Sequence, residues 1–241
     1  MAAITNKQQF LNQVLNLLKK KYDLPADPEP RTVLEHLVYA ICREGATRAQ
    51  AEPAFRRLRQ NFFDWNDVRV SSPREVAESL AGLPNAPARA QRIIGLLQEI
   101  FETTFSFDLE ELDKKGLKRA ATQLGRYKDV DDYALAWVIQ QALGGHAIPL
   151  DAPAVRVLRR LGVVEEEPES IEALRGSVEH AVPKARGPAF VELISRVAHV
   201  VCWEENPNCK ACPLRSECPT GQERLRGGAD APKAGPRLKS R

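Results

Sequence analysis

The chain has 241 residues, of which 43% are apolar, and its formal net charge is +3. This length and apolar content are sufficient for one large or two small domains with their own cores, so a mostly disordered or fibrous chain is excluded. No apolar run approaches the roughly 18 to 20 residues of a membrane helix, and the N-terminal segment lacks the apolar stretch of a secretory signal. We therefore expect a soluble cytoplasmic protein that has no membrane partner.

The basic charge of the chain is concentrated at its C-terminal end. Residues 223–241 contain six Lys or Arg against two acids, a net charge of +4, so the rest of the chain sums to −1. Because a DNA-binding domain usually carries its positive charge on a folded face, net charge alone does not indicate a nucleic-acid partner. We expect residues 222–241, which have almost no apolar side chains, to form a disordered basic tail that either keeps the chain in solution or binds phosphate.

Helical patterns follow one another along the chain. Apolar residues at helical spacing predict a helix over residues 6–22, which the Pro-rich segment LPADPEP ends, and a buried helix over residues 31–42. Further helices are predicted over residues 47–62, 72–81, 86–103, 108–123, 132–143, 152–161, 168–181 and 187–201. No strand alternation appears, and the connections are short and marked by Pro, Gly or Asn. The sequence therefore predicts an all-α fold.

Four of the five cysteines lie within seventeen residues, directly after the last predicted helix: Cys202, Cys209, Cys212 and Cys218. Disulfides are disfavoured in a reducing cytoplasm. Zinc sites usually combine two C-x2-C pairs, whereas only Cys209 and Cys212 form such a pair. The wider arms of six and five residues let four thiolates reach the four irons of a 4Fe-4S cluster, which the spacing favours, although zinc stays open as an alternative. The fifth cysteine, Cys42, is expected to be a core thiol.

The spacing C-x6-C-x2-C-x5-C after a long helix resembles the iron-sulfur loop of the endonuclease III family of DNA-repair glycosylases. Residues 133–162 resemble the second helix of the family's helix-hairpin-helix, its glycine-containing turn and the helix that an aspartate opens. The resemblance implies two helical domains: a six-helix domain over residues 27–144 and a 4Fe-4S domain over residues 1–26 and 145–221. It also implies a monomer, associated with the nucleoid, that acts on damaged or mismatched double-stranded DNA.

Two residues occupy the positions of the family's catalytic groups. Asp151 matches the family aspartate, which stabilises the cationic sugar formed during base release or helps to activate the nucleophile. Tyr133 lies eighteen residues earlier, where bifunctional members have a nucleophilic lysine. Because a tyrosine cannot form a Schiff base at neutral pH, the resemblance implies base excision without strand cleavage. The simpler alternatives are an N-cap role for Asp151, which precedes Ala-Pro and an apolar helical pattern, and a packing role for Tyr133.

Several DNA-contacting features of the family are altered in this chain. The hairpin glycines, whose backbone N–H groups approach a phosphate, correspond to Asp129 and Asp131, so phosphate binding at the hairpin is expected to be badly weakened. The glutamine that fills the space left by an extruded base corresponds to Gly45, which has no side chain to fill it. Residues 114–128 hold six basic residues and no acid, and this surface either keeps a DNA contact or is merely solvated.

The remaining candidates for contact with the DNA backbone are five basic residues: Arg126, Lys128, Arg156, Lys210 and Arg215. Arg43 and Arg48 flank an expected exposed turn, where each either contacts phosphate or is solvated. The sequence therefore predicts a monofunctional DNA N-glycosylase with a 4Fe-4S cluster. A catalytically inactive nucleic-acid-binding homologue is the alternative, because the nucleophilic lysine and the hairpin glycines are missing.

Overall fold

The computed structural model describes residues 6–24, 29–164 and 171–226. All regular secondary structure in these ranges is helical, which confirms the predicted all-α fold. In chain order the elements are α1 (Lys7–Lys21), α2 (Val33–Arg43), α3 (Arg48–Asn61), α4 (Trp65–Val70), α5 (Pro73–Ser79), α6 (Ala86–Thr104), α7 (Glu111–Lys114), α8 (Leu117–Leu124), α9 (Asp132–Gln141), α10 (Ala152–Arg160), α11 (Ile171–Ala181), the 3-10 helix η1 (Lys184–Arg186), α12 (Gly187–Val200) and α13 (Pro219–Arg226). Among the described residues, no helix is both long and apolar enough to cross a lipid bilayer.

Local capping signals define the short turn between α2 and α3. The hydroxyl of Thr47 accepts a hydrogen bond from the backbone N–H of Gln50, and the Gln50 side chain accepts one from the Thr47 N–H. Thr32 and Glu35 form the same reciprocal pair at the start of α2. Each pair satisfies N–H groups that the first turn of a helix leaves without an intrahelical partner. The hydrogen bonds between Thr47 and Gln50 thus fix the end of the turn over residues 44–47, where α3 begins.

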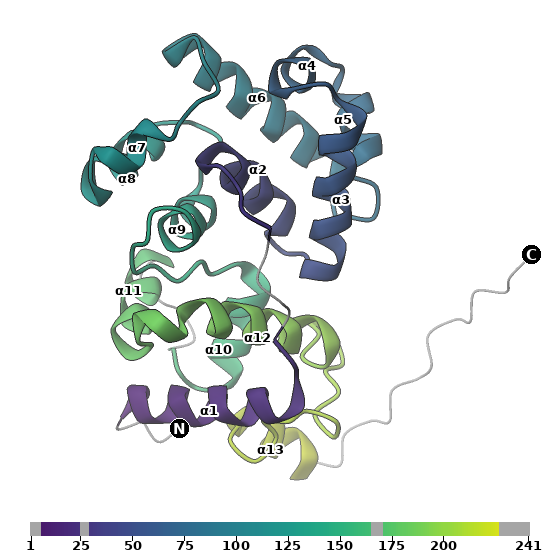
Figure 1. Cartoon of the computed structure of the whole chain (residues 1–241). Coiled ribbons are helices and arrows are strands. Elements are labelled where there is room, and N and C mark those ends of the chain that lie inside the picture. The colour runs from purple at the N-terminus through teal and green to yellow at the C-terminus, as the bar shows by residue number, and fades with distance from the viewer. Residues whose placement is uncertain (1–5, 25–28, 165–170, 227–241) are drawn as a thin grey trace, which may run out of the picture.

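The helices form two groups, which lie one above the other in Figure 1. In the upper group α2 packs against α9, α3 and α6, while α4 and α5 pack against α6. In the lower group α12 packs against α10 and α1, and α1 also contacts α11, so the N-terminal helix joins helices from the C-terminal half. Contacts between α9 and α12 connect the two groups. The predicted domain boundaries at residues 26–27 and 144–145 stay a prediction.

Three details of helix extent differ from the sequence-based expectation. The helix predicted over residues 108–123 is interrupted between α7 and α8, where Gly116 has a positive φ of 81°. Helix α4 was not predicted, because six residues span fewer than two helical turns and give little periodic signal. Helix α13 extends through residues 222–226, which were expected to be disordered; the rest of that expected tail lies outside the described residues.

Candidate active site and metal centre

Asp151 is the N-cap residue of α10, and both of its carboxylate oxygens accept hydrogen bonds from backbone N–H groups. Oδ1 accepts from the N–H of Ala154 at 2.9 Å, which is the expected capping bond. Oδ2 accepts from the N–H of Gly45 at 2.9 Å, across 106 positions of sequence. The residue is 6% exposed. Its carboxylate therefore faces two fixed donors and the positive end of the α10 dipole, an environment that stabilises negative charge.

Gly45 provides the second of these donors from the turn that follows α2. Its φ of 63° lies in the left-handed region that favours glycine. The sequence-based interpretation treated Gly45 only as the loss of a side chain that fills a vacated base stack. In the structure Gly45 has a second role, because the hydrogen bond from its backbone N–H connects the end of α2 to the start of α10. No local pattern in the sequence indicates this contact between distant segments.

Tyr133 lies in the first turn of α9 and is 5% exposed. Its ring stacks on that of Trp137 one turn later, with ring centroids 6.2 Å apart. Burial raises the pKa of the Tyr133 phenol well above its ordinary value of 10, and the Arg43 cation offsets only part of that effect. The nearby Asp151 carboxylate raises this pKa further. Tyr133 therefore presents a neutral phenol at physiological pH.

Arg43 is buried, so the expectation that it lies on an exposed turn was wrong. Arg43 is the last residue of α2, and its side chain, which is 1% exposed, points into the protein. The guanidinium donates to the backbone oxygen of Ala46 and, at 3.2 Å, to Oε2 of Glu192 on α12. The Tyr133 and Glu192 side chains raise the Arg43 pKa against the opposing effect of burial. Its Nε has no hydrogen-bond partner among the described residues.

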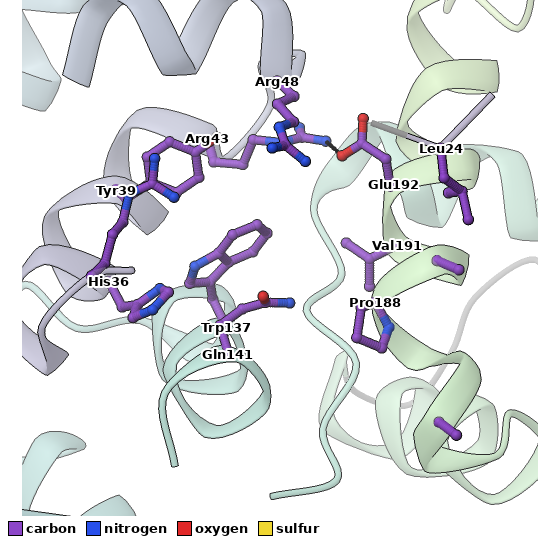
Figure 2. A pocket seen from close by; sticks show the side chains of 13 residues that line it. Leu24, His36, Tyr39, Arg43, Arg48, Trp137, Gln141, Pro188, Val191 and Glu192 are labelled. Carbon is purple, nitrogen blue, oxygen red and sulfur yellow. Dashed lines mark hydrogen bonds and ion pairs between the residues drawn. The ribbon is translucent and has the colours of Figure 1, made fainter. Parts of the chain in front are cut away.

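A cavity of about 260 Å³ lies beside Arg43, between α2, α9 and α12 (Figure 2). Tyr39 and Trp137 form an aromatic wall, with ring centroids 5.6 Å apart. His36 also lines the cavity, and burial lowers its pKa to about 4, with a smaller contribution from the Arg31 cation, so the imidazole is neutral at pH 7. Three buried polar atoms of the lining lack a partner within the described chain: His36 Nδ1, Arg43 Nε and Trp137 Nε1. A planar ligand with its own polar edge suits this lining.

The cavity adjoins a smaller space at the two sequence-predicted catalytic residues. Asp151 and Tyr133 line a narrow space of about 10 Å³, and Val191 of α12 lines both this space and the larger cavity. Arg43 interacts electrostatically with both predicted residues. The fold thus brings Asp151 and Tyr133 together, eighteen residues apart in sequence, beside an aromatic cavity that the sequence analysis did not predict.

The four clustered cysteines line one small common space of about 20 Å³: Cys202, Cys209, Cys212 and Cys218. All are free thiols, so the structure gives no support to disulfides. Burial raises the pKa of Cys212 to about 11, and the neighbouring thiols add to the shift. If all four lost their protons, a cationic centre between them would have to offset the repulsion of the thiolates. Within the described ranges, no three or more His, Cys, Asp or Glu side chains are arranged to hold a metal ion.

Two donors point at sulfur atoms of this cysteine cluster. The backbone N–H of Gly221 donates to Cys218 Sγ at 3.3 Å, and Arg160 Nη1 donates to Cys202 Sγ at 3.4 Å. Arg160 also binds the backbone oxygens of residues 203 and 204, which holds the loop against α10. Hydrogen bonds to sulfur stabilise its thiolate form, so the surroundings fit a thiolate-bound iron-sulfur group.

The basic residues predicted to contact DNA differ in their surroundings. Arg156 donates to the backbone oxygens of Cys202 and Ala198, at 3.0 and 3.1 Å, so its guanidinium supports the cysteine loop. Lys210 and Arg215 are exposed on that loop, and Arg215 donates to the Lys210 backbone oxygen at 3.2 Å. The DNA contacts of these three residues stay a prediction.

In the hairpin between α8 and α9, the exposed side chain of Asp131 is bound by other groups of the protein. Asp131 caps α9 by accepting from the N–H of Ala134 at 2.8 Å, and its other oxygen pairs with Arg92 of α6 at 2.7 Å. The same guanidinium donates through Nε to the Asp129 backbone oxygen at 2.9 Å. The Asp131 charge is thus paired with Arg92, and the weakened phosphate binding expected at the hairpin stays a prediction.

Comparison with solved structures identifies the architecture. A non-covalent complex of endonuclease III with DNA matches with a TM-score of 0.72 and 20% sequence identity, covering 92% of this chain and 100% of that chain. The chain has the endonuclease III fold. A thermostable thymine-DNA glycosylase is also similar, with a TM-score of 0.65 and 19% identity over 90% of this chain and 97% of its own. The resemblance to endonuclease III is thus confirmed at the level of the fold.

Sequence comparison finds distant curated relatives. No protein-family profile matches the chain. DNA glycosylase/AP lyase ROS1 of Arabidopsis thaliana is 27% identical over 190 residues, which cover 70% of this chain and 14% of that protein. Protein ROS1A of Oryza sativa subsp. japonica is 26% identical over 176 residues, which cover 66% of this chain and 9% of that protein. The chain therefore spans only a small part of these relatives, which are longer proteins.

Proposed function

We propose that this protein is a monofunctional DNA N-glycosylase, which extrudes one nucleotide from double-stranded DNA and releases its base by hydrolysis. The observation that carries the proposal is the position of Asp151, a buried carboxylate next to an aromatic cavity. The endonuclease III fold and the similarity to DNA glycosylases support it. We further propose that the protein acts as a monomer in the cytoplasm, at the nucleoid, on damaged or mismatched duplexes.

The cavity beside Asp151 is suited to an extruded base. Extrusion costs a few kcal/mol, which contacts with the flipped base must offset. Tyr39 and Trp137 line the cavity with rings tilted at 44° to each other, and Arg43 Nε and Trp137 Nε1 are donors without a partner in the described chain. A base in this cavity would cover the aromatic wall and satisfy these buried donors, which would otherwise cost about 1 to 3 kcal/mol each.

The two predicted catalytic residues have different roles in this reaction. Cleavage of the glycosidic bond leaves positive charge on the sugar, which a carboxylate in the position of Asp151 stabilises electrostatically. Its two backbone hydrogen bonds hold the carboxylate in one orientation. Tyr133 supplies neither an amine nor, with its raised pKa, a phenolate, so water is the nucleophile and no covalent enzyme-DNA intermediate forms.

The test is a base-release screen across duplexes that contain damaged and mismatched bases. Replacing Asp151 by Asn removes the charge at nearly constant shape and should lower base release by about 100-fold or more. Asp64→Asn is the matched control, because Asp64 is also an N-cap aspartate but caps α4, away from the site. No base release by the wild-type protein from any duplex in the screen would contradict the proposal.

A catalytically inactive nucleic-acid binder is the second candidate. One observation favours it: the bonds from Ala154 and Gly45 already occupy both oxygens of Asp151, so a purely structural capping role explains its burial. In that case the wild-type protein retards duplex DNA but releases no base, and Asp151→Asn lowers thermal stability while leaving binding intact. Base release lost in Asp151→Asn would exclude this candidate.

We also propose that the four clustered cysteines hold a 4Fe-4S cluster. The shared space, the mutual effect of the thiols on their pKa and the donors Gly221 and Arg160 support a thiolate-bound group. When bound, the cluster supplies a cationic centre that ties the C-terminal loop to α10 and α12. Metal analysis of the purified protein distinguishes it from zinc: four irons per chain are expected, and zinc without iron would contradict the assignment.

A further inference from the structure

The hairpin between α8 and α9 has backbone N–H groups that already bind acceptors of the protein. The N–H of Lys128 donates to Oε2 of Glu99 on α6 at 2.8 Å, and the N–H of Val130 donates to the backbone oxygen of Tyr127 at 3.0 Å. A carboxylate thus binds a hairpin N–H group that would otherwise be available to a phosphate. Because an anion would have to displace Glu99, this hairpin is poorly suited to bind DNA through its backbone alone.

Cations gather directly beside this hairpin, in a groove between α8 and α6. Lys115, Lys118, Arg119 and Arg126 line it, around open space of about 1260 Å³. Lys118 and Arg119 belong to α8, and Lys115 and Arg126 lie just before and just after this helix. All four are exposed. Within the described ranges none of the four forms an ion pair with an acidic residue of the chain.

Unpaired like charges that line one groove repel each other, and solvent ions or a polyanion relieve this repulsion. Neutral polar groups lie between the cations: Thr122 and Gln123 of α8 and Thr103 of α6 line the same groove. The Thr103 and Thr122 hydroxyls already donate to the backbone oxygens of Glu99 and Lys118, so the cations are the main groups of the lining that can bind phosphate. The single acid of the lining, Glu99, is hydrogen-bonded to the hairpin.

We propose that the groove between α6 and α8, named here the α8 groove, binds the phosphate backbone of the DNA duplex in place of the hairpin N–H groups. This inference rests on the proposed function, since it takes DNA as the partner. Arg126 and Tyr127 belong to both the groove and the hairpin turn, so a strand that passes the hairpin can continue along α8. A helix of eight residues is about 12 Å long, enough for on the order of three phosphates of one strand.

The test compares two triple variants of the full chain with its metal bound. Lys118→Ala/Arg119→Ala/Arg126→Ala removes three cations of the α8 groove. Its matched control, Lys19→Ala/Lys20→Ala/Lys21→Ala, removes three exposed cations from the last turn of α1, in the other group of helices (Figure 1). Both variants lose the same charge, and alanine preserves helix propensity. Circular dichroism checks that each variant is folded.

Binding of an undamaged fluorescent duplex is measured between 50 and 200 mM salt. If the groove cations contact phosphates, the slope of log affinity against log salt should become less steep by about 2.7, or 0.9 for each lost contact. Between 50 and 200 mM salt, the factor by which affinity falls should then be roughly 40-fold smaller for the groove variant than for the wild-type protein. The α1 control should keep the wild-type slope.

The outcomes separate this proposal from the proposed function. Equal salt slopes for the groove variant and the α1 control overturn the groove, even if the wild-type protein releases bases. A reduced slope for the groove variant alone supports the groove, even if no duplex yields base release and the glycosylase proposal fails. Displacement of the duplex by polyglutamate at equal charge concentration would assign the groove to an acidic protein instead, which also overturns it.

Discussion

The carboxylate of Asp151 accepts a hydrogen bond of 2.9 Å from the backbone N–H of Gly45. This contact joins the turn after α2 to the first turn of α10, and so fixes the candidate catalytic carboxylate to the other group of helices. The Gly45 N–H can reach Asp151 because the residue adopts a φ of 63°. The backbone conformation at position 45 is therefore part of the site.

Replacing Gly45 by Ala should both destabilise the protein and impair base release. A side chain in the left-handed region costs roughly 1 to 2 kcal/mol, and relief of that strain would move the N–H away from Asp151. Gly82→Ala is the matched control, because Gly82 also has a positive φ, of 91°, with open space around it. Thermal unfolding should detect both changes, whereas only Gly45→Ala should slow base release. Equal base release in the two variants would contradict a role for the contact.

Replacing Tyr133 by Lys should introduce an amine that attacks the sugar. The amine would lie near the buried Arg43 cation, and both burial and that cation disfavour a second positive charge, so it would be neutral and nucleophilic. Borohydride reduction in the presence of a substrate duplex should trap a covalent adduct with Tyr133→Lys. The wild-type protein and Tyr133→Phe should give none. An adduct with the wild-type protein would mean that an amine elsewhere in the chain acts on the sugar.

His36 should make stability depend on pH in the mildly acidic range. Its folded-state pKa of about 4 lies below the ordinary value of 6.5, so the unfolded chain binds more protons between these values. The contribution of His36 to the free energy of unfolding is present above pH 6.5 and is lost as pH falls towards 4. From pH 7 to 4.5 the loss should be about 2.5 kcal/mol.

Urea unfolding at pH 7 and pH 4.5 measures this loss. His36→Gln removes the titrating group, so the variant should lose less stability than the wild-type protein over the same interval. His180→Gln is the control, since His180 is exposed on α11. If His36→Gln and His180→Gln show the same pH dependence, the neutral buried state of His36 is not the source of the effect.

Replacing Cys218 by Ala should abolish metal binding. Its sulfur lies beside the other clustered thiols and accepts the Gly221 N–H. Cys42→Ala is the control, because Cys42 is 0% exposed in the core and burial raises its pKa to about 12. Iron content and visible absorbance should be lost in Cys218→Ala and retained in Cys42→Ala. Full iron content in Cys218→Ala would remove Cys218 from the ligand set.

Most of the helices, α4 and α13 excepted, and the spacing of the candidate site residues could be read from the sequence because their signals are local. Thr32 and Thr47 precede helices with a capping partner three residues later, and both helices begin within two residues of the predicted positions. The spacing of Cys202 to Cys218 and the interval from Tyr133 to Asp151 lie within short segments. Helix α13 lacked such a signal, since Gly221 is its only buried residue.

Only the tertiary structure decided how these segments meet. The inward position of Arg43, the walls of the cavity and the bond from Gly45 to Asp151 all join residues far apart in sequence. The same holds for Glu99, which binds the N–H of Lys128 from another helix. Periodicity and capping depend on neighbours within one or two turns, whereas burial and hydrogen-bond partners depend on which helices pack together. The sequence therefore determined the helices and their chemistry, and packing determined which groups face the cavity and which are already bound.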